Sequence, residues 1–505
     1  MRHTSVRFVA AFAAFAVMAT ACGKDRDSSA DTTVAAAVTA TSVASTTAPT
    51  TADSTATSEG TATSDSTSDS VVDTTPVTDA APTGPMFGDA PWPCSAGDGA
   101  NTDSGSEVGV TADSIAIASG DDAGYAGSPG LNHQITDAMK ALVAKCNELG
   151  GINGRQITLN YYDAELFNVG PAMQSACDGG NFMLVGEGWA FDGNQEEIRL
   201  ACGLPAVPTY TVSAAFAMGK DVFQGVPNPA DETPAGVFAQ TTKLLGDAVQ
   251  HVGMLVGNYS ATQETRDKVV AAAPAFGWSF AETSLEYSIT GEADWTPFVK
   301  QLQEAGATAV GWSGSCLPNL QLFAQAAKAN GYDVPIITDA NHYEQSCAAA
   351  NTDGALDNLY VRMGFIPFEE ADVNPATKDY VDLVTAAGGD ISLLGAQATS
   401  SFMLWAQAAS DCGAELTRAC TLENLKNTNT WTGHGLHAET DPGGNHPPKC
   451  NIVLRLEGDT YVRVAPQERG TFECDDSWIA KLSGLPALDA AKLDANRISQ
   501  QFTGN

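Results

Sequence analysis

From about residue 114 onward, the hydrophobic pattern alternates between short β-rich runs and longer runs with helical spacing. This alternation is typical of parallel βαβ units. We predict strands, in chain order, at 114–119, 156–162, 182–186, 206–209, 252–256, 279–288, 309–313, 335–338 and 358–363, with helices between them. A hairpin of residues 451–456 and 461–464 ends the pattern. The predicted fold class is therefore α/β.

Three breaks rich in Pro, Gly or polar residues divide the pattern, at 227–234, 367–375 and 432–448. A chain that crosses three times between two lobes produces this order of blocks, whereas two tandem domains need only one crossing. We predict two Rossmann-like lobes with parallel central sheets, joined by three crossovers. Lobe 1 comprises residues 94–228 and 367–428, lobe 2 comprises residues 229–366 and 429–475, and residues 476–505 form a C-terminal tail.

The N-terminus follows a different pattern, typical of export. Arg2 and Arg7 precede an apolar run, and the small residues 19–21 lead directly to Cys22. Residues 1–21 have the build of a signal peptide, and the run 8–21 is too short to span a bilayer, which takes about 20 residues. Residues 19–22 resemble a bacterial lipobox, which predicts lipidation of Cys22 and an extracytoplasmic protein anchored to the cell membrane. An ordinary cleavage site beside an unmodified cysteine is the alternative.

Residues 22–93 are rich in Thr, Ser and Ala, and the part from 31 to 80 has no Lys, Arg or aromatic residue. Such a segment has little to bury against the entropy cost of ordering. We predict a disordered stalk that keeps the folded part near the membrane. Ser/Thr-rich stalks are also candidates for O-glycosylation.

Charge and cysteine content narrow the functional classes. The chain has 60 acidic and 25 basic residues and a net charge of -35, which excludes most nucleic-acid roles because like charges repel. Without Cys22, an even number of the 11 cysteines remains, which favours disulfides in an exported chain. Pairing of sequence neighbours, with other pairings left open, predicts Cys94 with Cys146, Cys177 with Cys202, Cys316 with Cys347, Cys412 with Cys420, and Cys450 with Cys474.

Several segments together resemble a known family. They are Gly150-Gly151-Ile152-Asn153-Gly154-Arg155-Gln156-Ile157, Tyr161-Tyr162-Asp163-Ala164, 203–208, 294–299, 306–310 and 331–336. Their order and spacing resemble type I periplasmic-binding proteins, the Leu/Ile/Val-binding family that serves ABC importers, over about residues 110–466. The resemblance implies a monomeric solute-binding protein without catalysis or cofactor. It would capture a small polar molecule, such as an amino acid or amide, between closing lobes and deliver it to an ABC permease.

In open α/β sheets, ligands bind beyond the carboxyl ends of the strands, because loops and free backbone N–H groups converge there. Applied to the predicted strands, this rule points to loops of both lobes that face each other across a cleft. The candidate ligand-binding residues of lobe 1 are Tyr125, Glu187, Gly188, Trp189, Thr209, Tyr210 and Thr211. Those of lobe 2 are Tyr259, Ser313 and Asp339.

Aromatic candidates such as Trp189 offer flat apolar area with a polar tip, which suits the sandwiching of a small solute; the alternative is packing within one lobe. Glu187 either binds an ammonium or hydroxyl group or caps the next helix. The resemblance implies that Thr209 and Thr211 hold a ligand carboxylate and that Asp339 meets an ammonium. However, residues 187–190 lack the Ser or Thr of the family pattern, which argues against a plain α-amino acid.

Other chemistries are represented only weakly. His434, His437 and His446 lie near Asp441, but their spacing matches no zinc pattern, so we predict no metal site. Residues 126–130 miss the G-x-S-x-G motif at its first position, which argues against a hydrolase that uses Ser128. Residues 121–122 are either a cation ligand pair or a solvated loop. A sensory lipoprotein of the same fold, without a transport role, is the main alternative function.

Overall fold

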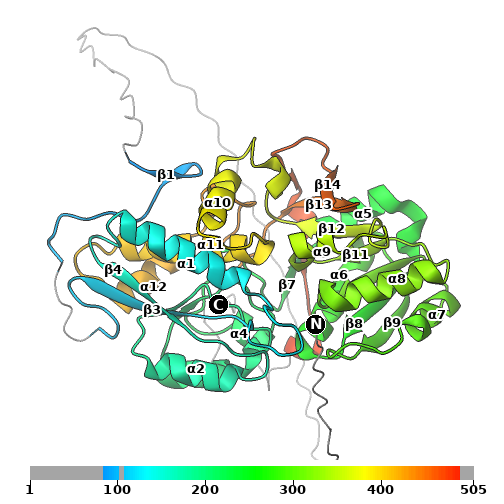
Figure 1. Ribbon diagram of the computed structural model, residues 1–505, viewed down its shortest axis with the longest axis horizontal. Coiled ribbons are helices and arrows are strands. Elements are labelled where there is room, and N and C mark those ends of the chain that lie inside the picture. The colour runs from blue at the N-terminus through cyan, green and yellow to red at the C-terminus, as the bar shows by residue number, and fades with distance from the viewer. Residues whose placement is uncertain (1–83, 102–106, 489–505) are drawn as a thin grey trace, which may run out of the picture. The chain divides into compact units, whose positions relative to one another are not determined.

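The computed structural model describes residues 84–101 and 107–488, all of which belong to one unit of the chain, residues 79–505 (Figure 1). The predicted signal peptide, Cys22 and most of the predicted stalk lie outside the described residues. Among the described helices, none has both the length and the hydrophobicity needed to cross a bilayer.

Lobe 1 is built on a four-stranded parallel sheet in the order β4-β3-β5-β6. Its strands, all close to the predicted positions, are β3 (Ser114–Ser119), β4 (Gln156–Tyr161), β5 (Leu184–Val185) and β6 (Ala206–Val207). Figure 1 shows α1 and α2 on opposite sides of this sheet. The helices are α1 (Gln134–Glu148), α2 (Val169–Asp178), α3 (Glu196–Cys202), α4 (Ala214–Ala217), α10 (Pro375–Ala386), α11 (Leu393–Ser410) and α12 (Arg418–Lys426).

Lobe 2 is built on a larger, mixed sheet in the order β14-β13-β12-β11-β10-β8-β9. The parallel strands are β8 (Val252–Gly257), β9 (Phe280–Tyr287), β10 (Ala309–Ser313), β11 (Ile336–Thr338) and β12 (Leu359–Met363). The helices are α5 (Gly236–Leu245), α6 (Ser260–Ala272), α7 (Thr296–Glu304), α8 (Gln321–Ala329) and α9 (Gln345–Ala349).

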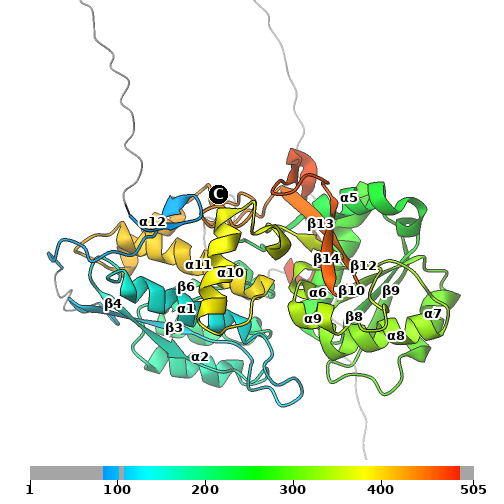
Figure 2. The same cartoon turned by 45° about the horizontal axis from the view of Figure 1, so that its top comes forward.

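The predicted C-terminal hairpin is confirmed as β13 (Cys450–Glu457) and β14 (Thr460–Ala465), and it lies beside β12 (Figure 2). Both pairings are antiparallel. A short turn joins β13 to β14, whereas the chain passes through α10, α11 and α12 between β12 and β13. A short strand, β15 (Glu473–Cys474), pairs with the start of β13. The sheet of lobe 2 is therefore parallel at its centre and antiparallel at this edge.

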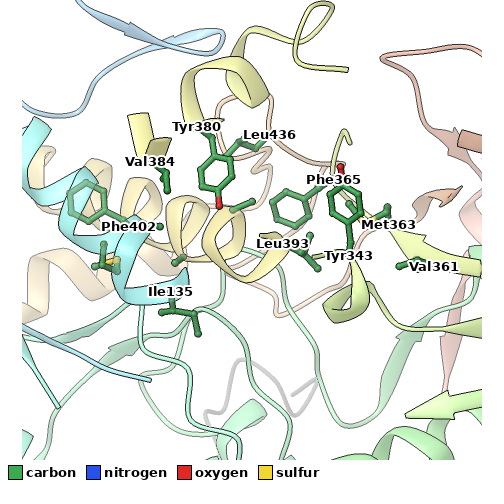
Figure 3. Packing of buried hydrophobic residues seen from close by; sticks show 14 of the residues in the cluster. Ile135, Tyr343, Val361, Met363, Phe365, Tyr380, Val384, Leu393, Phe402 and Leu436 are labelled. Atoms are coloured by element: carbon green, nitrogen blue, oxygen red, sulfur yellow. The ribbon is translucent and has the colours of Figure 1, made fainter. Parts of the chain in front are cut away.

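The chain passes between the two sheets three times: between α4 and α5, between β12 and α10, and between α12 and β13. The second passage is part of a continuous core. Figure 3 shows Phe365 and Leu393 between the helices of lobe 1 and strand β12 of lobe 2. The buried residues labelled there are Ile135, Tyr343, Val361, Met363, Phe365, Tyr380, Val384, Leu393, Phe402 and Leu436. The α/β class with two lobes and three crossovers is confirmed.

The end of the predicted stalk differs from the expectation of disorder. Residues 84–93 include two short antiparallel strands, β1 (Met86–Phe87) and β2 (Ala90–Pro91). Phe87 is fully buried and packs edge-on against Trp92, with ring centroids 5.5 Å apart. The backbone N–H of Gly88 donates to Asp379 Oδ2 of α10 at 2.8 Å. The prediction was wrong for these residues, because Phe87 and Trp92 provide the apolar area that the preceding segment lacks.

The predicted C-terminal tail also contributes to the fold. Its residues Ile479–Lys481 form strand β16, which pairs antiparallel with β7 (Glu232–Pro234) in the first crossover. Trp478, next to this strand, is buried. The last part of the chain that the structure describes therefore covers a crossover between the lobes.

All five predicted disulfides are confirmed, each between neighbouring cysteines of the sequence. Cys94–Cys146 attaches the N-terminal segment to α1, and Cys177–Cys202 joins α2 to the end of α3. Closing a loop restricts the unfolded chain, so each bond is worth about 2–4 kcal/mol. The pairs restrain segments that are close in sequence and leave the crossovers without a disulfide across the lobes.

Candidate ligand-binding site

A cavity of about 580 Å³ lies between the lobes, within the usual size range of small-molecule sites. Its walls come from loops that follow strands of both sheets, as the rule for open α/β sheets predicts. In lobe 1 these loops follow β3, β4, β5 and β6; in lobe 2 they follow β8, β9, β10 and β11. The first and second crossovers complete the wall, through Asn228 and Phe365 among others.

Six of the ten candidate residues line this cavity: Tyr125, Tyr210, Thr211, Tyr259, Ser313 and Asp339. They come from five different loops. Glu187, Gly188, Trp189 and Thr209 do not line it. The loop rule therefore located the right segments, but it did not identify which side chain of each segment faces the cavity.

Trp189 shows the difference most clearly. Its side chain is fully buried and belongs to a hydrophobic cluster of lobe 1 that includes Phe216 and Val222. Its Nε1–H donates to the backbone oxygen of Tyr162 at 3.3 Å. The prediction that Trp189 faces the cleft was wrong, because its large apolar ring fills the lobe interior. The adjacent Ala190 lines the cavity instead.

Glu187 and Thr209 are also fully enclosed in lobe 1. Glu187 Oε1 accepts a hydrogen bond from Gln195 Nε2 at 2.9 Å, and burial raises the pKa of Glu187 to about 8. The Thr209 hydroxyl has no hydrogen-bond partner among the described residues. Thr211 lines the cavity, but its hydroxyl donates to Gln224 Oε1 at 2.8 Å. Neither threonine hydroxyl is thus presented as a free donor to a ligand carboxylate.

Two buried aspartates of lobe 1 accept hydrogen bonds from backbone N–H groups of the surrounding loops. Asp122 accepts hydrogen bonds from the N–H groups of Leu166 at 3.0 Å and Ala190 at 2.9 Å. Asp192 accepts from the N–H groups of Val212 at 2.6 Å and Ser213 at 2.9 Å. Burial raises the pKa of Asp122 to about 6 and that of Asp192 to about 7. Backbone donors near the strand ends, which often bind ligand anions, are satisfied here by the protein itself.

Asp121 has a related structural role. It accepts hydrogen bonds from the hydroxyls of Thr136 and Tyr161 and from the N–H of Ala123. Asp121 and Asp122 are both fully buried. The interpretation of residues 121–122 as a solvated loop is wrong, because both side chains are buried. Through these hydrogen bonds the two carboxylates hold loops of lobe 1 in place.

Lobe 2 places two cationic side chains on the cavity wall, Lys268 of α6 and Arg362 of β12. Arg362 Nε donates to Asp339 Oδ1 at 2.7 Å, so the aspartate expected to meet a ligand ammonium already has a cationic partner. Lys268 Nζ donates to Asn228 Oδ1 at 3.0 Å and to the oxygen of Pro229 at 2.7 Å. Burial lowers the pKa of Lys268 to about 8.

The sequence analysis missed Lys268 and Arg362. The usable signal was the scarcity of basic residues, 25 in 505. In such an acidic chain, a single arginine within the apolar run 359–363 is unusual enough to examine. Lys268 gave no comparable signal, because a lysine on a helix is ordinarily exposed.

Comparison with known proteins agrees with this geometry. Residues 119–460 match the family model described as periplasmic binding protein. The chain belongs to the periplasmic binding protein family. The resemblance to its type I members is confirmed, and the comparison with curated proteins returned no match.

Solved structures of the type I periplasmic-binding fold are similar over most of the described chain. A fatty acid ABC transporter substrate-binding protein from Thermomonospora curvata is 16% identical, with 71% of this chain and 92% of that chain covered and a TM-score of 0.58. A leucine-, isoleucine-, valine-, threonine- and alanine-binding protein from Brucella ovis, in a closed conformation, is 17% identical, with 70% and 94% covered and a TM-score of 0.58. An ABC transporter solute-binding protein from R. palustris, in complex with 4-hydroxybenzoate, is 14% identical, with 70% and 96% covered and a TM-score of 0.58.

In this periplasmic binding protein, a row of aromatic rings connects the two lobes near the cavity. Tyr125, Phe167, Phe191 and Tyr259 follow one another with centroid separations of 5.6 Å. Phe191 belongs to lobe 1 and Tyr259 to lobe 2, so their contact crosses between the lobes. Glu264 of α6 also crosses, because its Oε2 accepts from the N–H of Ala214 at 3.1 Å. The described conformation thus has direct contacts between the lobes.

Two of the three histidines considered as metal ligands, His437 and His446, have separate hydrogen-bond partners. His437 is hydrogen-bonded to Ser400 Oγ and to the oxygen of Ala438, and His446 contacts Glu232 Oε2. Within the described residues, the group that brings potential ligands together is a different one, His133, Asp137 and Asp390. There, the two ring nitrogens of His133 contact different carboxylates, that of Asp137 at 2.9 Å and that of Asp390 at 3.5 Å.

Ser128 lines the cavity. In the part of the chain that the structure describes, its hydroxyl has no hydrogen bond to a histidine or carboxylate. A serine nucleophile needs a neighbouring base within hydrogen-bond reach. The arrangement therefore gives no support to the hydrolase interpretation.

Proposed function

We propose that this protein is an extracytoplasmic, membrane-tethered solute-binding protein that captures a small molecule between its lobes and delivers it to an ABC importer. One observation carries the proposal: in a chain of the periplasmic binding protein family, loops from both lobes enclose a cavity of about 580 Å³. Five disulfides and the signal-like N-terminus support an extracytoplasmic location. The lipid at Cys22 is part of the proposal.

Capture requires that the ligand favour the closed arrangement of the lobes over the open one. A ligand shifts this equilibrium only by its difference in affinity for the two states. Groups on both walls, such as Tyr210 of lobe 1 and Tyr259 of lobe 2, contact one ligand together only when the lobes are close. Hinge closure of periplasmic binding proteins is a general example of this mechanism.

The chemistry of the walls favours a ligand with an apolar body. The lining includes aromatic residues from both lobes, among them Tyr125, Tyr210, Tyr259 and Trp312. The case for an α-amino acid ligand, which the family resemblance implied, is weaker. Asp339 is already paired with Arg362, and Thr209 is buried outside the cavity. One structural neighbour is named as a fatty acid ABC transporter substrate-binding protein and another is in complex with 4-hydroxybenzoate; fatty acids and 4-hydroxybenzoate are of the amphipathic kind that such a wall would accept.

Thermal unfolding of the purified protein against a panel of solutes tests capture. The panel contains amino acids, amides, polyols, aliphatic acids and aromatic acids. A ligand that binds the native state at 100 times its Kd adds about 2.7 kcal/mol to the free energy of unfolding. A raised Tm with one chemical class is the expected result, and no shift with any class would contradict capture of such solutes.

Uptake measurements separate transport from sensing. A strain that lacks the gene should lose uptake of the identified solute, and the unmodified gene should restore it. If the strain takes up that solute at the normal rate, the delivery role is wrong and a sensory lipoprotein becomes the better description. Replacement of Cys22 by Ala tests the tether in the same strain, through release of the protein from the membrane fraction.

A further inference from the structure

We propose that the ligand carries a carboxylate that Arg362 and Lys268 hold on the lobe 2 wall, while its apolar body lies against the tyrosines of lobe 1. This inference rests on the proposed function and names the ligand class: a small monocarboxylate with an aromatic or aliphatic body. The ligand would then lie in the opposite orientation to the one that the family resemblance implied, in which hydroxyls of lobe 1 hold the carboxylate.

The first step is that several backbone N–H groups of lobe 1, which could have bound a ligand carboxylate, already donate to carboxylates of the protein itself. The backbone N–H groups of Leu166 and Ala190 bind Asp122, and those of Val212 and Ser213 bind Asp192. An incoming carboxylate would have to displace an internal one. A buried carboxylate left without its donors is costly, so such an exchange gains nothing.

The second step is the position of Arg362. Its Nε donates to Asp339, and among the described residues its two Nη groups have no hydrogen-bond partner. Arg362 lines the cavity, and its side chain is about one quarter exposed, at 28%. A planar guanidinium with free Nη donors is suited to bind a carboxylate, because its donor geometry matches two carboxylate oxygens.

The third step is the position of Lys268. Its two observed acceptors, the Asn228 amide and the Pro229 carbonyl, are both neutral oxygens. An ammonium has three donors, and these two oxygens accept two of them. The Arg362 guanidinium is near enough to contribute to the lowered pKa of Lys268. A bound carboxylate would relieve this repulsion between two like charges.

Both acidic and basic groups surround Lys268, so the site is not expected to bind every kind of anion. Glu264 lies on the same helix and Asp231 in the first crossover, while Asp339 directly follows β11 and Arg362 lies on β12. Asp339 offsets the charge of Arg362. Binding of a monoanion is consistent with this balance of two cations and three nearby carboxylates.

The fourth step is the remaining surface. Tyr125 and Tyr210 of lobe 1 line the cavity with their rings, and Tyr210 OH accepts a hydrogen bond from Asn132 Nδ2 at 3.3 Å. Aromatic faces of this kind bind apolar groups through contact area rather than charge. The cavity therefore combines a cationic end on lobe 2 with an aromatic wall on lobe 1.

Matched pairs of ligands on the unmodified protein test the inference directly. Calorimetry with benzoate, 4-hydroxybenzoate, hexanoate and octanoate is compared with the corresponding amides. At least one acid should bind about 10- to 100-fold more tightly than its amide, the loss expected for a charge-assisted hydrogen bond. Acids and amides of equal affinity, or amides alone that bind, would overturn the carboxylate site and leave solute capture intact. If no solute of any class binds, the proposed function itself fails.

Two variants locate the carboxylate. Lys268→Met removes one cation, and the double variant Arg362→Gln with Asp339→Asn removes the other together with its partner, so that no unpaired charge is left. Each should weaken binding of the acid about 10-fold or more and leave amide binding within about threefold. Lys300→Met, on the exposed face of α7, is the matched control. Unchanged acid affinity in both folded variants would overturn the assignment.

The pH dependence of binding to the unmodified protein provides a separate test of Lys268. Binding of the acid should weaken as the pH rises through about 8, where Lys268 loses its proton. Binding of the amide should not change in this range, and Lys268→Met should lose this part of the pH dependence. An acid affinity that is flat from pH 7 to 10 would contradict the role of Lys268.

Discussion

Lobe 1 and lobe 2 both bring the carboxyl ends of parallel strands to the cavity, but their charged groups are arranged differently. In lobe 1, the carboxylates of Asp122 and Asp192 are buried and bind the backbone of the surrounding loops. In lobe 2, Lys268, Arg362 and Asp339 remain partly accessible on the wall. The comparison teaches that loops at the carboxyl ends of parallel strands can use their polar side chains in two ways. These side chains can hold the loops in place, as in lobe 1, or remain accessible to a ligand, as in lobe 2.

The largest expected effect concerns Trp189, the interior aromatic residue of lobe 1. Trp189→Ala should lower the free energy of unfolding by about 3–5 kcal/mol, because it opens a cavity in a packed core. Urea unfolding measures this loss. Trp189→Phe, which keeps most of the volume, should retain ligand affinity within about threefold. Loss of binding in a stably folded Trp189→Phe protein would mean that lobe 1 presents this residue to the ligand after all.

Asp122 and Asp339 provide the sharpest test of the contrast between the lobes. Asp122→Ala leaves two backbone N–H groups without their acceptor and should cost about 2–5 kcal/mol of unfolding free energy. Asp339→Ala removes a partly exposed ion pair and should cost at most about 1 kcal/mol. Chemical denaturation of both variants measures the difference. Similar losses would show that the two walls do not differ in this way.

The buried acid Glu187 predicts a pH effect on stability. Its pKa in the folded protein, about 8, lies above the ordinary value, so its favourable contribution is complete below about pH 4.5 and is lost as the pH rises through 8. Glu187→Gln removes this dependence. Relative to the unmodified protein, the variant should gain about 1–3 kcal/mol between pH 5.5 and pH 9.

Urea unfolding at the two pH values measures this gain. Glu148→Gln on α1, where the carboxylate is exposed, is the control and should show no comparable gain. If Glu187→Gln behaves like the control, then Glu187 is ionised at little cost, and lobe 1 is better solvated than its burial indicates.

The smallest expected effect concerns the contact between the lobes. Tyr259→Leu removes the aromatic contact with Phe191, a pair worth about 0.5–1.5 kcal/mol beyond its buried area. Ligand affinity should fall about 3- to 10-fold by calorimetry. Phe276→Leu, a partly buried aromatic residue of lobe 2 away from the cavity, is the control. Equal affinities would show that the aromatic row does not contribute to the closed arrangement.

The elements of the fold were largely predictable because they depend on local patterns. Strands such as Ser114–Ser119 and Val252–Gly257 lie where short apolar runs occur, and the final hairpin followed from alternation around a turn. The five disulfides were predictable because each joins two cysteines that follow one another in the sequence. The strand β16 was missed, since its partner β7 lies far away in the chain.

The candidate site was only partly predictable. The loops after the strands were found, and Tyr125, Tyr210 and Tyr259 line the cavity as expected. The direction of each side chain within a loop was not predicted. Trp189 points into the lobe, while the adjacent Ala190 faces the cavity. A one-residue difference of this kind depends on how the loop backbone is held, here partly by Asp122.

The amino-acid sequence by itself determined the succession of strands and helices, the pairing of the cysteines and the segments whose loops line the cavity. These properties follow from hydrophobic periodicity and short separations along the chain, which act before any distant contact forms. Only the tertiary structure decided that Asp122 and Asp192 are turned inward, and that Lys268 and Arg362 meet at the cavity. The charge environment of a side chain depends on its burial and on neighbours from distant segments, and these arise only when the chain has folded.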